Sequence, residues 1–264
     1  MHPVLFELFG FKVGTYGVLI ASAVIIGLLW LRRLAKRAGV DPEPLTDLVV
    51  GATIAALIGA KLLLVLTDWH AFIAAPLDWA KDNLRAFGVY YGGFIAAVLY
   101  ILWACRRKKL DFWVTVDLMA PPLALGHAIG RWGCFAAGCC YGRETRVPWA
   151  VIFRDPASLI NPELLGVPVH PVQLYESAGN FLLAALLAAG LRKKWPAGRV
   201  FILYLFVYGI TRFIYEMFRG DAIRGMMFDG LLSTSQFLAI LTVAAAAGLF
   251  VWRRRALPHE TKNP

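Results

Sequence analysis

One segment near the C-terminal end of the chain, YGITRFIYEMFRG, combines arginine and glutamate inside an apolar stretch. Its polar members Tyr208, Arg212, Glu216 and Arg219 follow i, i+4, i+8 and i+11 spacing, which is one face of a helix. A charged side chain in a membrane span costs roughly 2.5–3.5 kcal/mol and needs a partner. The stripe therefore predicts either a functional site or an Arg212–Glu216 pair that holds two helices together.

A second segment, GHAIGRWGCFAAGCCYGRET, places an arginine among repeated glycines. Arg131 offers a planar fork of donors that suits a phosphate, and Arg212 can supply a second, so together they could hold a phospholipid head group. Glycines let the backbone approach a bound group, although they also serve helix packing. His127 lies one turn before Arg131, where it is either a general base or a packed histidine.

A third segment, HPVQLYES at residues 170–177, begins with a proline turn that predicts the start of a helix. Gln173, Tyr175 and Glu176 fall in the first turns of that helix. For these three side chains we expect a capping and packing role.

The elements that must position these residues are membrane helices. The chain has 264 residues, of which 59% are hydrophobic and 17% charged, and its long apolar stretches approach the ~20 residues that cross a bilayer. We predict an all-α integral membrane protein that forms a single domain over residues 1–264. The N-terminus lacks a basic region and a cleavage site, so we expect the first span to be retained. About seven spans are expected, at 13–31, 48–67, 87–104, 112–130, 172–191, 199–218 and 229–252.

Basic clusters follow alternate predicted spans and account for more than half of the 27 lysines and arginines. The positive-inside rule then predicts an outside N-terminus and a cytoplasmic C-terminus. The clusters are Arg32 to Arg37, Arg106 to Lys109, Arg192 to Arg199, and Arg253 to Arg255 with Lys262. Because the net charge of +10 comes from span ends, it does not indicate a nucleic-acid partner. Residues 68–86, the loop region 131–171 and residues 219–228 are expected on the outer side.

With these segments placed, the chain resembles the prolipoprotein diacylglyceryl transferase family over nearly its full length. The resemblance rests on ordered landmarks along the chain and not on a single motif. These are Tyr16-Gly17, the pair Gly92-Gly93 after Tyr91, Gly130-Arg131-x-Gly133, Gly142-Arg143, His170-Pro171-x-Gln173-Leu174-Tyr175-Glu176, Tyr208 through Arg212 to Glu216, and Ser235-Gln236.

The resemblance implies transfer of a diacylglyceryl group from phosphatidylglycerol to the lipobox cysteine of a prolipoprotein signal peptide, with release of glycerol 1-phosphate. It implies a multi-pass protein of the bacterial cytoplasmic (inner) membrane, in contact with membrane lipids and with its active site toward the outer face. No metal or organic cofactor is expected, because a thiolate and a phosphate are already a competent nucleophile and leaving group. The expected catalytic residues are Arg131, Arg212, His127 and Tyr91, and the expected substrate-binding residues are Tyr16, Gly92, Gly93, Gly133, Gly142, Tyr208 and Glu216.

The sequence departs from the family pattern at several polar positions. The family usually has a histidine where this chain has Tyr91, and asparagines and a glutamate where it has Cys134, Ala137 and Cys139. These departures leave open a phospholipid-dependent transferase with a different acceptor. The intramembrane arginines leave open a second alternative, a transporter of an anionic lipid or small solute. His127 is the candidate to replace the absent histidine.

Three cysteines fall close together in the altered loop. A disulfide would join Cys134 to Cys139 or Cys140, since adjacent cysteines make a strained pair, and free thiols are equally compatible. A metal site with His127 as fourth ligand and a catalytic or acceptor thiol are the other two interpretations.

Overall fold

The structure is a computed structural model that describes residues 3–8, 11–83, 88–221, 225–228 and 230–256. Lys262 and parts of the expected outer segments, residues 84–86 and 222–224, lie outside these ranges. The nine helices of the described chain are α1 (Thr15–Arg37), α2 (Pro42–Thr67), α3 (Trp69–Ala74), α4 (Pro76–Asn83), α5 (Tyr90–Arg107), α6 (Phe112–Ala137), α7 (Val172–Arg192), α8 (Arg199–Glu216) and α9 (Thr234–Ala256). The prediction of an α-helical membrane protein is confirmed.

Five of the described helices, α1, α2, α6, α7 and α9, are long and apolar enough to cross a membrane. The shorter helices α5 and α8 occupy the other two predicted spans. A count of seven spans and the orientation of the two termini remain predictions. Helix α6 differs from its expected span, because it continues to Ala137 and so carries Arg131 inside a helix and not in the loop.

The chain divides into two compact units, and each is described by itself. The smaller unit, residues 31–115, contains α2 and α5, which pack closely through glycines. A Cβ on Gly93 would lie 2.9 Å from the carbonyl oxygen of Ala56, and one on Gly92 would overlap the backbone of Gly59. Small residues at such positions allow two helix backbones to approach in a membrane. This division does not test the prediction of a single membrane domain, which stays a prediction.

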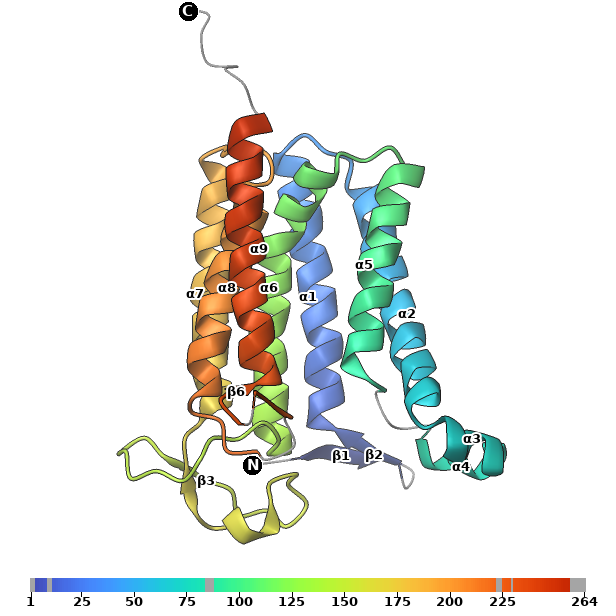
Figure 1. Cartoon of the computed structure of the whole chain (residues 1–264), viewed down its shortest axis with the longest axis vertical. Helices are drawn as coiled ribbons and strands as arrows, with labels where there is room; N and C mark the ends of the chain where they lie inside the picture. The colour runs from blue at the N-terminus through green and yellow to red at the C-terminus, as the bar shows by residue number, and fades with distance from the viewer. Residues whose placement is uncertain (1–2, 9–10, 84–87, 222–224, 229, 257–264) are drawn as a thin grey trace, which may run out of the picture. The chain divides into compact units, whose positions relative to one another are not determined.

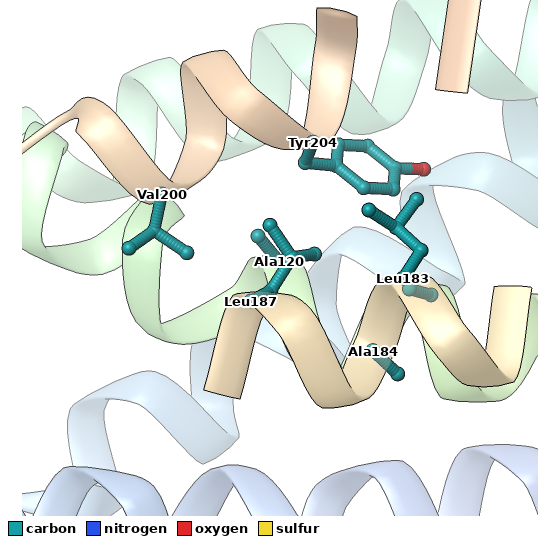
Figure 2. Packing of buried hydrophobic residues seen from close by; sticks show 7 residues of the cluster. Ala120, Leu183, Ala184, Leu187, Val200 and Tyr204 are labelled. Atoms are coloured by element: carbon teal, nitrogen blue, oxygen red, sulfur yellow. The ribbon is translucent and has the colours of Figure 1, made fainter. Parts of the chain in front are cut away.

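The larger unit, residues 1–30 and 116–264, has its core between α6, α7 and α8. Small side chains of α6 and α7 let the helices approach, while Leu183, Leu187 and Tyr204 fill the space between them (Figure 2). A buried polar contact adds to this packing, since Ser177 Oγ donates to the carbonyl oxygen of Ala128 at 2.9 Å. The core thereby fixes the helices that carry the polar stripe.

The first turn of α8 is tied to α6 by a buried carboxylate. Asp117 is 4% exposed, and its two carboxylate oxygens accept hydrogen bonds of 2.7 Å from the amides of Gly198 and Phe201. A negative group at a helix N-terminus satisfies free amides and suits the helix dipole. Asp117 therefore sets the position of α8 along α6.

Short strands and loops lie together at one end of the larger unit's helices (Figure 1). Strand β1 (Val4–Leu8) pairs antiparallel with β2 (Phe11–Gly14), and β3 (Val151–Ile152) pairs antiparallel with β4 (Pro168–Val169) around a 3-10 turn at Pro162–Leu164. The pair β5 (Met226–Met227) and β6 (Leu232–Ser233) precedes α9. The basic C-terminal ends of α7 and α9 lie at the opposite end (Figure 1).

Candidate active site

A buried carboxylate near the start of α7 gathers three arginines. Glu176 is 1% exposed, and its Oε2 lies 2.6 Å from Arg131 Nε of α6. Its other oxygen, Oε1, lies 3.9 Å from Arg212 Nη1 of α8 and 3.8 Å from Arg219 Nη1. Glu176 is thus the centre of an arginine cluster, which we define as Glu176 with Arg131, Arg212 and Arg219.

Three members of the predicted stripe, Tyr208, Arg212 and Glu216, lie on α8, and Arg219 follows its end. The predicted Arg212–Glu216 pair is present, and the functional role of the stripe stays a prediction. Arg212 Nη1 lies 2.7 Å from Glu216 Oε2 one turn later, as the spacing indicated. Arg212 Nη2 donates to Ser235 Oγ of α9 at 2.9 Å. The Arg212–Glu216 pair lies within α8, and the hydrogen bond to Ser235 is the contact that links α8 to α9.

Arg219 follows the end of α8 and is 6% exposed at its side chain. Its Nε and Nη2 donate to the two carboxylate oxygens of Asp221 at 2.8 and 2.5 Å, a bidentate arrangement that fixes the guanidinium plane. Its backbone pairs with Gly142 in an isolated antiparallel bridge. A Cβ on Gly142 would lie 2.5 Å from His170 Cβ, so glycine at this position lets the backbone pass close to His170. The segment that carries Gly142 therefore contacts both Arg219 and His170.

His127 lies against Arg131, as the one-turn spacing predicted. Arg131 Nε donates to His127 Nε2 at 3.2 Å, while the ring centroid of Tyr208 lies 5.5 Å from that of His127. A neutral histidine that accepts at Nε2 carries its proton on Nδ1. The basic nitrogen of His127 therefore faces Arg131, and a role as general base stays a prediction.

Helix α1 approaches this region through Tyr16. A Cβ on Gly133 would lie 3.0 Å from Tyr16 Cδ2, which is tighter than ordinary packing. Glycine at this position of α6 therefore brings Tyr16 close to the turn that carries Arg131. Among the predicted site residues, Tyr16, Gly133, Tyr208, Arg212 and Glu216 all belong to the larger unit.

Three other predicted site residues, Tyr91, Gly92 and Gly93, belong to the smaller unit. The two glycines face α2, as described above, and Tyr91 is 44% exposed beside Tyr90. These contacts fit a packing role for the glycines. Their assignment to substrate binding, and that of Tyr91 to catalysis, stay predictions.

Three thiols lie beside the arginine cluster. The sulfurs of Cys134, Cys139 and Cys140 lie within 4.8 Å of one another, and all three cysteines are free. Arg131 Nη1 lies 4.0 Å from Cys134 Sγ. Hydrogen bonds from the two neighbouring thiols lower the pKa of Cys140, and nearby guanidinium groups lower it further. This group is the one cluster of potential metal ligands found in the described part of the chain.

Comparison with known proteins decides the family. A family model described as prolipoprotein diacylglyceryl transferase matches residues 3–252. The chain is similar to the phosphatidylglycerol--prolipoprotein diacylglyceryl transferase of Clostridium tetani, at 38% identity over 96% of this chain and 97% of the relative. It is 36% identical to the protein of that name from Finegoldia magna, with 93% of both chains covered. A third relative, phosphatidylglycerol--prolipoprotein diacylglyceryl transferase 2 of Clostridium perfringens, is 35% identical over 95% of this chain and 94% of its own length. The chain belongs to the prolipoprotein diacylglyceryl transferase family.

Membership of the prolipoprotein diacylglyceryl transferase family confirms the resemblance and the enzyme class: the protein is a membrane transferase. The sequence reasoning missed the central place of Glu176, which was expected to cap and pack. It also left Arg219 out of the site, although the residue was part of the α8 stripe. The signal for both was a charged group at the end of an apolar span, where burial requires a partner.

Proposed function

We propose that this chain transfers the diacylglyceryl group of phosphatidylglycerol to the lipobox cysteine thiol of prolipoproteins and releases glycerol 1-phosphate. The observation that carries the proposal is the arginine cluster on buried Glu176. It occurs in a chain whose relatives are named for phosphatidylglycerol and prolipoprotein. A lipid phosphate is the anion that such a cluster suits.

Arg131 and Arg212 are the proposed phosphate ligands. A guanidinium carries five N–H donors in a rigid fork, so one arginine can bind a carboxylate and a phosphate together. Glu176 and Glu216 orient the two guanidinium groups before substrate arrives, through ion pairs of 2.6 and 2.7 Å. Prior orientation reduces the reorganisation that the transition state would otherwise require.

The reaction places new negative charge on the phosphate. The acceptor thiolate attacks the glyceryl CH2 carbon, an S–C bond forms, and the C–O bond to phosphate breaks with its electron pair on oxygen. The phosphate charge therefore rises from one to two as glycerol 1-phosphate leaves. Arginines near those oxygens bind the leaving group more strongly in the transition state than the diester in the ground state, which lowers the barrier.

The remaining site residues have supporting roles in the proposal. His127 positions Arg131 through the hydrogen bond described above, and Tyr208 packs against the ring of His127. Tyr16, Gly133 and Gly142 shape the space around the arginine cluster. Tyr91, Gly92 and Gly93 are kept as candidate substrate contacts, and Tyr91→Phe tests the catalytic role of the phenol.

The proposed location is the bacterial cytoplasmic membrane, with the site toward its outer face. The distribution of charge supports this placement. Arg131 lies near the C-terminal end of α6, and Glu176 lies near the N-terminal end of α7. In the larger unit these helix ends are on the side of the strands and loops, and the basic ends of α7 and α9 lie at the other end (Figure 1). Basic clusters mark cytoplasmic ends in multi-pass proteins.

The test is reconstitution of the purified chain in vesicles that contain phosphatidylglycerol, with a lipobox peptide added. Glycerol phosphate release and peptide mass are followed together for the native protein, Arg212→Ala and Arg254→Ala. Arg254 is an exposed arginine near the end of α9, so it controls for loss of a positive charge.

Peptide lipidation that Arg212→Ala reduces by at least about a hundredfold, and Arg254→Ala leaves unchanged, is the expected result. Glycerol phosphate release without peptide lipidation would show that the acceptor is not a prolipoprotein. Absence of both products from a folded protein would refute the transferase assignment.

A further inference from the structure

The three cysteines beside the arginine cluster are arranged as a set of ligands. Cys134 lies in the last turn of α6, and Cys139 and Cys140 lie in the turn that follows it. Their sulfurs all lie within 4.8 Å of one another. Four tetrahedral ligands around zinc, at about 2.3 Å each, place sulfurs about 3.8 Å apart. A closure of about 1 Å, within reach of side-chain rotation, would bring all three onto one ion.

The backbone that carries these cysteines is held on both sides. The amide of Cys139 donates to the carbonyl oxygen of Cys134 at 3.1 Å. Gln173 of α7, which is fully buried, donates from Nε2 to the carbonyl oxygen of Cys139 at 2.8 Å. Cys140 has a φ of 59°, a left-handed conformation that a non-glycine residue adopts at a cost of about 1 kcal/mol or more. The surroundings therefore hold the turn in a conformation that its own sequence disfavours.

We propose that Cys134, Cys139 and Cys140 bind one zinc ion, and that the open fourth position of this ion takes the thiol of the acceptor cysteine. Three protein ligands with one open position is the pattern of catalytic zinc, whereas structural zinc is closed by four. Thiolates select soft ions such as zinc over calcium or magnesium. Three sulfurs this close suit a single ion, because a cluster of several irons needs its cysteines further apart.

The surrounding charges fit bound thiolates. Cysteine binds zinc as the thiolate, so three cysteines and one Zn²⁺ carry a net negative charge. The Arg131 guanidinium, 4.0 Å from Cys134 Sγ, supplies a positive neighbour. His127 does not complete the ligand set, since its Nε2 faces Arg131. The fourth position is thereby left for an external ligand.

The chemical consequence rests on the proposed transferase function. Binding to zinc releases the proton of the acceptor thiol to solvent and leaves a thiolate at neutral pH. That sulfur then forms the S–C bond to the glyceryl CH2, the C–O bond breaks, and the electron pair leaves on the phosphate oxygen. The thioether product is a neutral and weaker ligand, so it leaves the ion. The ion would thus supply the thiol activation that the proposed reaction requires.

The experiment measures metal directly and needs no turnover. The full chain is purified in detergent without a metal-affinity step, and zinc, copper and iron per chain are measured by mass spectrometry of the elements. The variants are Cys134→Ser, Cys139→Ser and Cys140→Ser. Cys105→Ser is the matched control, because Cys105 is a buried free cysteine of the smaller unit. Circular dichroism and size-exclusion chromatography identify any variant that fails to fold.

The expected result is about one zinc per native chain, retained in Cys105→Ser and reduced to about a tenth in each of the other variants. Cobalt is then substituted for zinc in the native chain, and lipobox peptide is added without phosphatidylglycerol. The thiolate-to-cobalt absorption band should rise with the cysteine peptide and stay unchanged with a serine peptide.

Three results would overturn the proposal. These are native protein without stoichiometric metal, copper or iron in place of zinc, and a thiol titration in which two of the three cysteines form a disulfide. A zinc-free protein that still lipidates the peptide would refute the zinc site alone and leave the transferase function standing. A zinc-bound protein that does not lipidate the peptide would refute the transferase function and leave the zinc site standing.

Discussion

Glu176→Gln is the substitution that most sharply tests the arginine cluster. Glutamine keeps the shape of the side chain but removes its charge, and it directs N–H donors toward guanidinium groups that also donate. Glu176 is 1% exposed and has three arginines within 3.9 Å. Removing one partner of a buried ion pair costs about 3–5 kcal/mol, because the other charge stays buried without compensation.

The expected stability change can be read as a melting temperature. At about 2–4 °C per kcal/mol for a chain of this size, Glu176→Gln should lower Tm by about 6–20 °C. Glu163→Gln, which changes an exposed glutamate, is the control and should shift Tm by less than about 2 °C. Transfer activity should fall by about a hundredfold, since Arg131 loses its 2.6 Å partner and its position.

A double-mutant cycle with Arg131→Gln separates the ion pair from general loss of packing. The two residues are in contact, so their effects should be non-additive by at least about 2 kcal/mol. Additivity within about 0.5 kcal/mol, or a Tm for Glu176→Gln that matches the native protein, would refute the cluster as the organising contact of the site.

Three further predictions concern residues around the cluster. Asp117→Asn should lower Tm by about 2–8 °C in a thermal unfolding assay, because the carboxylate that accepts from the first amides of α8 loses its charge. Gly142→Ala should reduce lipidation in the peptide assay by at least about tenfold, because its Cβ would overlap His170 and displace the backbone beside the site. Burial, and then the charge of Arg143, lower the pKa of His170 in the folded protein. As pH falls below about 6.5, His170 is protonated in the unfolded chain before it is protonated in the folded protein. The free energy of unfolding therefore decreases in that pH range. His170→Asn should flatten the dependence of Tm on pH in that range, and an unchanged slope would show that another group titrates.

The membrane helices could be predicted from sequence because their signal is local. Apolar runs of about 20 residues and basic ends gave ranges that match helices such as α7 at Val172–Arg192 closely. The Arg212–Glu216 pair and the His127–Arg131 contact follow from i, i+4 spacing for the same reason. Periodicity within one helix is enough to place both.

The arginine cluster could not be predicted, because it joins residues from separate helices. Glu176 sits on α7, and nothing in local spacing indicates that Arg131 of α6 and Arg219 beyond α8 converge on it. The short strand pairs were also missed. The length of α6 was underestimated because Gly133 and nearby residues were read as the end of the helix. Gly133 lies inside the helix, where the absence of a side chain lets Tyr16 pack closely against it.

The most direct test of the account is the ratio of products in vesicles with phosphatidylglycerol and a lipobox peptide. The account predicts one glycerol 1-phosphate released per peptide that gains a diacylglyceryl group, and loss of both products in Arg131→Ala and Arg212→Ala. Lipidation that persists at the native rate in both arginine variants would contradict it.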